Sequence, residues 1–250
     1  MSQYFTEAIL LSVRDWGEAD KMVTVFSRDH GKITAIAYGC RRPRNRLAGI
    51  IQVFSQAELT MMQGKGLDTI KQGELKQSFR KIRENLDCMA YAAFVNELVA
   101  EFCPDRQPEP LVYDLLYHAL STITSRNPRL VALASAWQLL TLAGYQPLLD
   151  ACAACGRPIE DDAWFSAEKG GIVCLQCEHQ GLLPFGRAAR RFTENLLAVD
   201  WENVQGFSVN GGVLYQNERI LTGYVAYLLG KPLKSLAFIH QVSGVEAAHG

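Results

Sequence analysis

Four cysteines form two Cys-x-x-Cys pairs, and no other feature limits the folding of this chain as strongly. Cys152 and Cys155 are separated from Cys174 and Cys177 by 18 residues, a loop length typical of a four-thiolate zinc site. Each short spacing lets two sulfurs point at one metal from a tight turn, and two such turns supply tetrahedral coordination. Four protein ligands leave no position for water, so the sequence predicts one structural Zn²⁺ rather than a catalytic one.

Glycines flank both cysteine pairs and suit the turns that such a site needs. Gly156 follows the first pair, whereas Gly170 and Gly171 precede the second. Metal binding at a structural site contributes about 10 kcal/mol or more to folding, so the motif is expected to organise residues 150–179. Two disulfides or four ordinary buried thiols are the alternatives. His179 could replace one thiolate, although a role outside the ligand set is the expectation.

The overall composition is that of a globular protein with one or two domains. The chain has 250 residues, 48% of them hydrophobic, which is ample for real cores. No apolar run approaches the roughly 18 residues of a membrane span. The other cysteines are Cys40, Cys88 and Cys103, which makes an odd total, and no signal-peptide pattern precedes them. We therefore expect a cytoplasmic protein rather than a secreted disulfide framework.

The charge of the chain is unevenly distributed. Residues 1–80 carry 12 Lys and Arg against 8 Asp and Glu, a net charge of +4. Residues 81–250 carry 13 against 18, a net charge of −5, so that the whole chain has a net charge of −1. This asymmetry indicates an anionic partner for the first part only.

The first 79 residues have the pattern of short β-strands. In the first run, Phe5, Ile9, Leu11 and Val13 occupy odd positions, and turn residues separate the later runs. Five strands in fewer than 80 residues predict a small barrel, and the five-stranded oligonucleotide-binding barrel, or OB-fold, is the commonest such shape. The other expected strands are Met22–Phe26, Ile33–Tyr38, Gln52–Met62 and Thr69–Leu75.

After Phe79 the pattern becomes helical. Apolar side chains recur every three to five residues from Ile82 to Phe102. A second helix is expected from Pro110, and a third from Pro128 after the N-cap Asn127. Further helices are expected over 187–199 and 214–229, whereas 241–250 have little to bury.

These patterns together predict an α+β multidomain protein. An OB-fold barrel is expected over 1–79, and a helical bundle over 80–149 and 180–240. A zinc module with four cysteine ligands, over 150–179, interrupts this bundle.

An arginine-rich loop is the strongest candidate for binding an anion. Arg41, Arg42, Arg44 and Arg46 lie within six positions between two expected strands. Guanidinium groups pair with phosphate bidentately and keep their charge, so four of them predict a surface that binds the DNA backbone. A solvated run of charge is the alternative.

Other residues of the barrel are candidates to extend this surface. Lys21, Lys32 and Lys65 would add positive charge. Tyr38 or Phe26 could stack on bases, although packing in the core is the expected role of both aromatic residues.

The sequence gives little support for an enzymatic site. The histidines are dispersed and no His-Glu-x-x-His pair occurs. Cys40 lies among arginines that could lower its pKa, but no histidine base is near it in sequence. We therefore predict no catalytic residue and no small-molecule substrate.

Ordered segments from three regions resemble the RecO family of bacterial recombination mediators. The resemblance covers about residues 1–230 and implies an OB-fold barrel and a helical bundle. It also implies a zinc module in members that keep all four cysteines, as this chain does. The segments are Glu7–Ser12, Gly17–Phe26, Gly31–Ile33, Gly66–Thr69, Leu142–Pro147 before Cys152, and Phe165–Ser166 with Gly170–Gly171 before Cys174.

The resemblance also implies a function and a set of partners. The family's activity is non-catalytic: binding single- and double-stranded DNA, annealing complementary strands, and acting with RecR to load RecA onto DNA coated by single-stranded-DNA-binding protein (SSB). A bacterial, nucleoid-associated location in the cytoplasm follows from this activity. The acidic, phenylalanine-terminated tail of SSB is implied as one ligand, and it would require an apolar pocket with local positive charge.

Arg126 and Arg129 are the best basic candidates for that pocket, because they begin the helix that carries Trp137. In the alternative, Trp137 lies in the core and both arginines are solvated residues at the helix cap.

Two other functions are possible for the whole chain: a zinc-ribbon transcription or RNA-binding factor, which would show sequence preference, and a metal-dependent hydrolase, which would show turnover.

Overall fold

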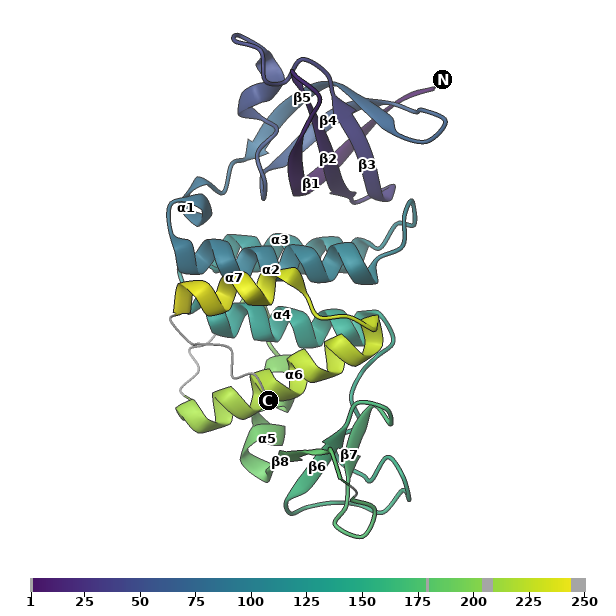
Figure 1. The fold of residues 1–250 in the computed structure, drawn as a ribbon, viewed down its shortest axis with the longest axis vertical. Helices are drawn as coiled ribbons and strands as arrows, with labels where there is room; N and C mark the ends of the chain where they lie inside the picture. Colours follow the sequence, from purple (N-terminus) through teal and green to yellow (C-terminus); the bar gives the residue numbers. More distant parts are fainter. Residues whose placement is uncertain (1, 179, 204–208, 244–250) are drawn as a thin grey trace.

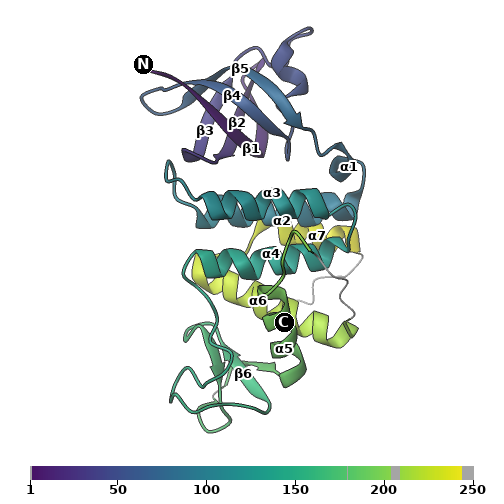
Figure 2. The same cartoon turned by 180° about the vertical axis from the view of Figure 1, so that it is seen from behind.

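The computed structural model describes residues 2–178, 180–203 and 209–243, and these form three layers stacked along the long axis of the molecule (Figure 1). A β-barrel lies at one end, helices lie in the middle, and a small sheet with the cysteines lies at the other end. The view from behind shows the same order, with α2 and α3 next to the barrel (Figure 2). No helix in the described part of the chain is long and apolar enough to cross a membrane.

The barrel is closed by five strands in the order β1-β2-β3-β5-β4. The β3–β5 pair is parallel and the other pairs are antiparallel, which is the arrangement of the OB-fold. The predicted barrel is therefore confirmed, although the fourth strand begins at Gln56 rather than at Gln52. The strands are β1 Gln3–Trp16, β2 Asp20–Ser27, β3 Gly31–Ala37, β4 Gln56–Met62 and β5 Asp68–Gln77.

The middle of the first strand, residues 8–11, is buried on both of its faces. Leu10 packs inside the barrel, whereas its neighbours Ile9 and Leu11 pack in the core shared with the helices. A register shift just after Leu10 changes the alternation, so that Val13 packs against the barrel core instead. Phe5 is 71% exposed. The expected single apolar face along odd positions is therefore wrong, because the bulge and the second covered face interrupt it.

Asn96 links the barrel to helix α2. Its buried side-chain amide donates hydrogen bonds to the backbone carbonyls of Leu10, at 3.3 Å, and Leu11, at 2.9 Å. The carbonyl of Leu10 also accepts from Phe54 N at 2.8 Å. Because a buried carbonyl without a partner is costly, Asn96 makes the docking of the barrel on this helix specific.

Further contacts surround this joint. Tyr113 of α3 donates a hydrogen bond to the Glu7 carboxylate at 2.9 Å, and Arg28 forms an ion pair with Asp114. The backbone of Gly31, at φ 67°, is so close to Gln107 that an added Cβ would lie 2.0 Å from its carbonyl oxygen. Only glycine fits at the start of β3 for both reasons.

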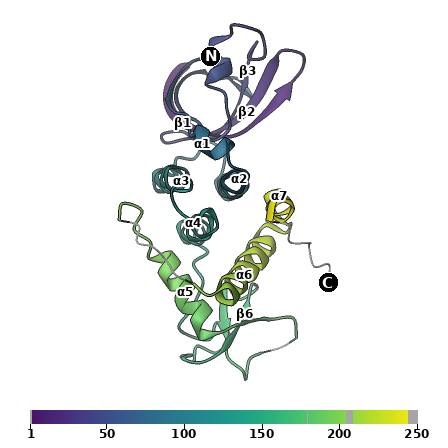
Figure 3. The same ribbon diagram turned by 90° about the vertical axis from the view of Figure 1, so that its left-hand side faces the viewer.

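The helices form a layered bundle in which α4 lies between the α2–α3 pair and the α5–α6 pair (Figure 3). Trp137 of α4 is fully buried and donates to Asn217 Oδ1 at 2.9 Å, so it is a core residue. The helices are α1 Arg80–Arg83, α2 Leu86–Phe102, α3 Pro110–Thr122, α4 Pro128–Leu142, α5 Arg187–Leu197, α6 Gly211–Leu229 and α7 Lys234–Ser243, and η1 Arg46–Gly49 is a short 3₁₀-helix.

Side-chain caps determine where two of these helices begin. Asn127 accepts hydrogen bonds from the first turn of α4, as predicted. Asn85 accepts from Cys88 N at 2.9 Å, and this cap divides the single helix that was expected from Ile82 into α1 and α2.

Helix α7 was not predicted from the sequence. Its start is capped by a residue of α2, since the Glu97 carboxylate accepts from Lys234 N at 2.9 Å and Ser235 N at 2.7 Å. It includes the first three of the ten residues expected to be unpacked, and 244–250 lie outside the described residues.

A three-stranded sheet in the order β7-β6-β8 follows α4 and was also not predicted. Because β8 comes after residue 179, this sheet extends beyond the expected module of 150–179. The strands are β6 Ala163–Ser166, β7 Gly171–Val173 and β8 Leu183–Phe185.

The Asn96 contact generates the first testable prediction. An Asn96→Leu substitution should lower the free energy of unfolding by about 1–3 kcal/mol, because it leaves the Leu11 carbonyl buried without its donor. Chemical denaturation would measure the change. Asn195→Leu, at an exposed position of α5, is the matched control. Equal stability of the two variants would contradict the role assigned to Asn96.

Candidate functional site

The four cysteines of the two pairs converge on one point. Their sulfur atoms all lie within 4.8 Å of one another, and Cys155 Sγ is 3.9 Å from Cys174 Sγ. Metal–sulfur bonds of about 2.3 Å in a tetrahedron place the sulfurs about 3.8 Å apart. The donor set and its spacing therefore fit a metal ion held by four thiolates. His179 lies outside the described residues.

Backbone pairing brings the two cysteine turns together. Ile172 N donates to the carbonyl of Leu148 at 2.9 Å, and Ala153 N donates to the carbonyl of Ile172 at 2.7 Å. The chain before the first pair thus lies along strand β7, which leads into the second pair. At Gly171 an added Cβ would lie 2.7 Å from both the Cβ and the carbonyl oxygen of Leu148, so this close pairing requires glycine.

Backbone amides prepare Cys152 to be a metal ligand. Burial raises the pKa of its thiol, but hydrogen bonds from the backbone N–H groups of Cys174, Ala154 and Cys155 outweigh burial and lower the pKa to about 6. Hydrogen bonds with Cys155 and Cys174 raise the pKa of Cys177 to about 12. Negative charge is therefore concentrated at the buried end of the cluster, where it attracts a cation, and metal binding would displace the remaining thiol protons.

Arg190 fastens this segment to the helices. Its side chain is nearly fully buried in α5, and its guanidinium donates to the carbonyls of Leu149, at 3.2 Å, and Ile159, at 3.0 Å. It also donates to the carbonyls of Glu160 and Asp161. The Arg190 guanidinium thus holds the chain on both sides of the first cysteine pair.

The other three cysteines are isolated and buried. Burial raises the pKa of the Cys40 thiol despite the positive charge of Lys21, so the arginine loop does not activate it. Burial also raises the pKa of Cys88, and that of Cys103 to about 12. These thiols are unreactive packing residues.

The arginine loop lies at the end of the barrel that faces away from the helices (Figures 1 and 2). All four predicted arginines are exposed. Asp20 accepts from Gly39 N at 2.7 Å, and the Asn45 side chain donates to the Gly39 carbonyl at 2.8 Å and accepts from Leu47 N at 2.8 Å. Short polar side chains therefore hold the backbone of the loop in place.

Most of the charge in this loop is available to a ligand. Arg41 lies 3.5 Å from the Asp15 carboxylate, in an exposed pair. Within the described residues, Arg42, Arg44 and Arg46 have no acidic partner. Exposed ion pairs are weak, so even Arg41 can exchange its partner for a phosphate.

A groove of about 520 Å³ lies beside the loop and includes two residues that sequence reasoning missed or set aside. Lys71 of β5 lines the groove together with Arg46, and only closure of the barrel brings them together. Tyr38 also lines it and is 56% exposed, contrary to the expected core packing. Trp16 at the end of β1 is 46% exposed near the turn that binds the loop backbone. Phe26 is fully buried, as expected.

The three predicted lysines lie in different places. Lys21 is close enough to Cys40 to affect its thiol and so adjoins the arginine loop. Lys65 is exposed on the β4–β5 loop, which projects from another side of the barrel (Figure 1). Lys32 is mostly buried: its ammonium donates to the Ala100 carbonyl and pairs with Asp105 at 3.4 Å. Lys32 therefore belongs to the joint with α2 and not to the arginine loop.

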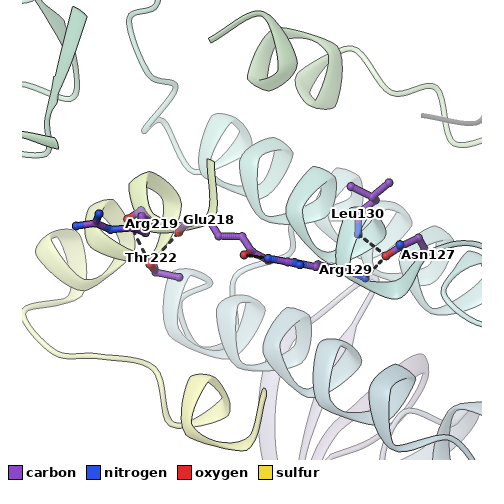
Figure 4. Close-up of polar contacts among 6 residues, drawn as sticks. All are labelled: Asn127, Arg129, Leu130, Glu218, Arg219 and Thr222. Atoms are coloured by element: carbon purple, nitrogen blue, oxygen red, sulfur yellow. Dashed lines mark hydrogen bonds and ion pairs between the residues drawn. The ribbon is translucent and has the colours of Figure 1, made fainter. Parts of the chain in front are cut away.

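An apolar pocket of about 200 Å³ lies between α2, α4, α6 and α7. Arg129 lines it, but Nε and Nη2 of its guanidinium both donate to the Glu218 carboxylate (Figure 4). Hydrogen bonding to Glu218 raises the pKa of Arg129. Arg126 is exposed just before α4 and is not a lining residue. The lining residues are Tyr91, Phe94, Arg129, Leu133, Tyr215, Glu218, Arg219, Leu221, Thr222, Leu236, Ile239 and His240.

Comparison with known proteins gives the family of the chain. Residues 1–79 match the family model for the N terminus of recombination protein O, and residues 83–237 match the model for its C terminus. The boundary between the two models lies where the barrel ends and the helices begin. The matches leave few residues of the chain uncovered.

Curated proteins match over nearly the same length. DNA repair protein RecO of Symbiobacterium thermophilum is 34% identical over 246 residues, which cover 96% of this chain and 97% of that protein. DNA repair protein RecO of Desulforamulus reducens is 33% identical, with 97% and 96% covered, and that of Pelotomaculum thermopropionicum is 31% identical, with 100% and 98% covered. The chain therefore belongs to the RecO family of DNA repair proteins.

Proposed function

We propose that this protein is a non-catalytic recombination mediator of the bacterial cytoplasm and nucleoid. It binds single- and double-stranded DNA, anneals complementary strands and, with RecR, helps to load RecA onto SSB-coated DNA. The observation that carries the DNA-binding part is the exposed arginine loop at the end of the barrel that faces away from the helices. The family relationship supports the repair context.

The chemistry of the loop favours binding without sequence preference. Guanidinium groups contact phosphates, which are the same in every sequence and in both single and double strands. Tyr38 and Trp16 are exposed near the loop and provide flat surfaces for stacking unpaired bases. Stacking of this kind leaves the Watson–Crick edges free, so a bound strand stays able to pair with its complement.

We propose that the metal in the cysteine cluster is a single structural zinc ion. Four thiolates without an open position are typical of structural zinc, which would stabilise the loop that Arg190 holds to α5. The ion would take no part in a reaction. Its contribution is to the folding of the end of the molecule opposite the DNA surface.

The apolar pocket between the helices is the proposed site for the acidic, phenylalanine-terminated tail of SSB. A cavity of about 150 Å³ accommodates benzene, so a pocket of about 200 Å³ has room for a phenylalanine side chain. Arg219 supplies local positive charge in a part of the chain that is acidic overall, and Arg129 lines the same pocket in its pair with Glu218. RecR would bind elsewhere on the same molecule.

Replacement of all four loop arginines by alanine tests the DNA surface. Affinity for unrelated sequences should fall, and the slope of log affinity against log salt on single strands should decrease by about 0.7 for each lost contact. Fluorescence anisotropy at several salt concentrations measures both. The same variant should anneal SSB-coated complementary strands poorly.

The matched control removes four exposed positive charges elsewhere: Lys169, Arg187, Arg191 and Lys234. It changes the net charge equally and should leave the salt slope nearly unchanged. An arginine-loop variant with the slope of the native protein would show that the loop is only a solvated run of charge. Strong preference for one sequence would instead favour a transcription or RNA-binding factor.

Substitution of Cys174 by serine tests the metal. Elemental analysis should find about one zinc per chain in the native protein and much less in the variant. The variant should unfold at a lower temperature, while the DNA affinity of the distant barrel should change little. Cys88→Ser, at a cysteine outside the cluster, is the control for metal content. Unchanged zinc and stability in Cys174→Ser would contradict the proposed site.

Titration with a labelled acidic peptide that ends in phenylalanine tests the pocket. We expect binding in the micromolar range that is lost in the Arg126→Ala, Arg129→Ala double variant. The two single variants then show whether the loss comes from Arg129, which lines the pocket, or from Arg126, which does not. Native-like affinity of the double variant would place the site elsewhere on the protein.

A further inference from the structure

The apolar pocket contains a carboxylate, that of Glu218, which already pairs with the half-buried cation Arg129. Arg129 Nε and Nη2 donate to the two carboxylate oxygens of Glu218, so the pair is bidentate (Figure 4). The Arg129 side chain is 36% exposed and that of Glu218 is 23% exposed. Partly buried charges lose water when they pair, and breaking such a pair without a substitute is unfavourable. In this state Arg129 offers no free charge to a ligand.

The next residue on α6 has the opposite property. The guanidinium of Arg219 lies over the Tyr215 ring, 5.8 Å from its centroid, and it has no acidic partner among the residues that the structure describes. Arg219 also lines an adjoining hollow of about 510 Å³, next to Pro184. Arg219 therefore lines both the apolar pocket and the hollow beside it, and its exposed charge is available to an approaching anion.

We propose that Glu218 limits the affinity of this pocket for an acidic peptide by holding Arg129 until the carboxylate of a bound peptide replaces it. Arg219 makes the first contact with the acidic peptide. A free C-terminal carboxylate can then take the place of Glu218 on Arg129 while the terminal aromatic side chain enters the pocket beside Phe94 and Leu133. This inference rests on the proposed binding of the SSB tail.

Exchange of one carboxylate for another explains which peptides can bind. A peptide with a free carboxylate restores a bidentate pair on Arg129, so the cost that remains is that Glu218 loses its partner. A peptide whose end is amidated restores no pair, and if it displaces Glu218 it leaves both Arg129 and Glu218 unpaired. Selectivity then comes from a penalty on the wrong ligand as much as from attraction of the right one.

Peptide titrations on the native protein and four variants test this inference: Glu218→Gln, Arg219→Ala, Arg129→Ala and the double variant Arg129→Ala, Glu218→Gln. The probe is the labelled acidic peptide that ends in phenylalanine, with a free or an amidated C terminus. Glu218→Gln should bind the free-acid peptide about tenfold more tightly than the native protein, because Arg129 is released from its charged partner. The same variant should still prefer the free-acid peptide, because only that peptide supplies a carboxylate to Arg129. Arg219→Ala should bind both peptides more weakly.

The double variant Arg129→Ala, Glu218→Gln separates this mechanism from general repulsion. If Glu218 acts by occupying Arg129, the gain from Glu218→Gln should vanish when Arg129 is absent. A gain of equal size in both backgrounds would overturn the inference, because it would show that Glu218 only repels an acidic peptide. An unchanged affinity in Glu218→Gln would overturn it as well.

Two substitutions at exposed positions outside the pocket serve as charge-matched controls, namely Glu168→Gln and Arg191→Ala, and neither should change peptide affinity. Thermal unfolding of each variant shows that it is folded.

The outcomes distinguish the two proposals. If the native protein binds the peptide and every pocket variant binds equally, the tail still binds the protein but the role assigned to Glu218 is wrong. If no form binds, tail binding itself is wrong. Binding by Glu218→Gln alone would support the internal carboxylate as the barrier.

Discussion

The joint between the barrel and helix α2 is the constraint on which the rest of the structure depends. Strand β1 must satisfy two cores at once, because Leu10 packs inside the barrel and Ile9 and Leu11 pack among the helices. A bulge makes this possible by changing the alternation of the strand, and the amide of Asn96 binds carbonyls at the bulge. The barrel is thereby mounted in one orientation on the helices.

This mounting separates the candidate functional surfaces. The side of the barrel near α2 and α3 is covered, so the arginine loop is displayed at the free end, and the cysteine cluster lies at the far end of the molecule (Figure 1). A DNA strand on the loop and a peptide in the pocket between α4 and α6 would not compete for space. The separation suits the proposed function, in which the protein holds DNA while it contacts a protein already bound to that DNA.

Much of the site could be predicted because it is encoded locally. The spacing of the four cysteines and the density of four arginines in one loop are properties of short segments, and the structure brings the former together and exposes the latter. Lys32 and Lys71 could not be sorted in this way. Lys32 lies in β3 and Lys71 in β5, and no local pattern distinguishes them. Closure of the barrel places Lys71 in the groove, whereas docking on α2 places Lys32 beside Asp105.

The sequence by itself determined the barrel, the helices with their own caps, and the cysteine and arginine motifs, because hydrophobic periodicity, side-chain caps and ligand spacing act over a few residues. Tertiary structure alone decided where α7 begins and what Arg129 does. The cap of α7 comes from Glu97 on α2, and the partner of Arg129 is Glu218 on α6. Interactions between groups so far apart in the chain leave no local pattern, because their energy depends on distances that exist only after the helices have packed.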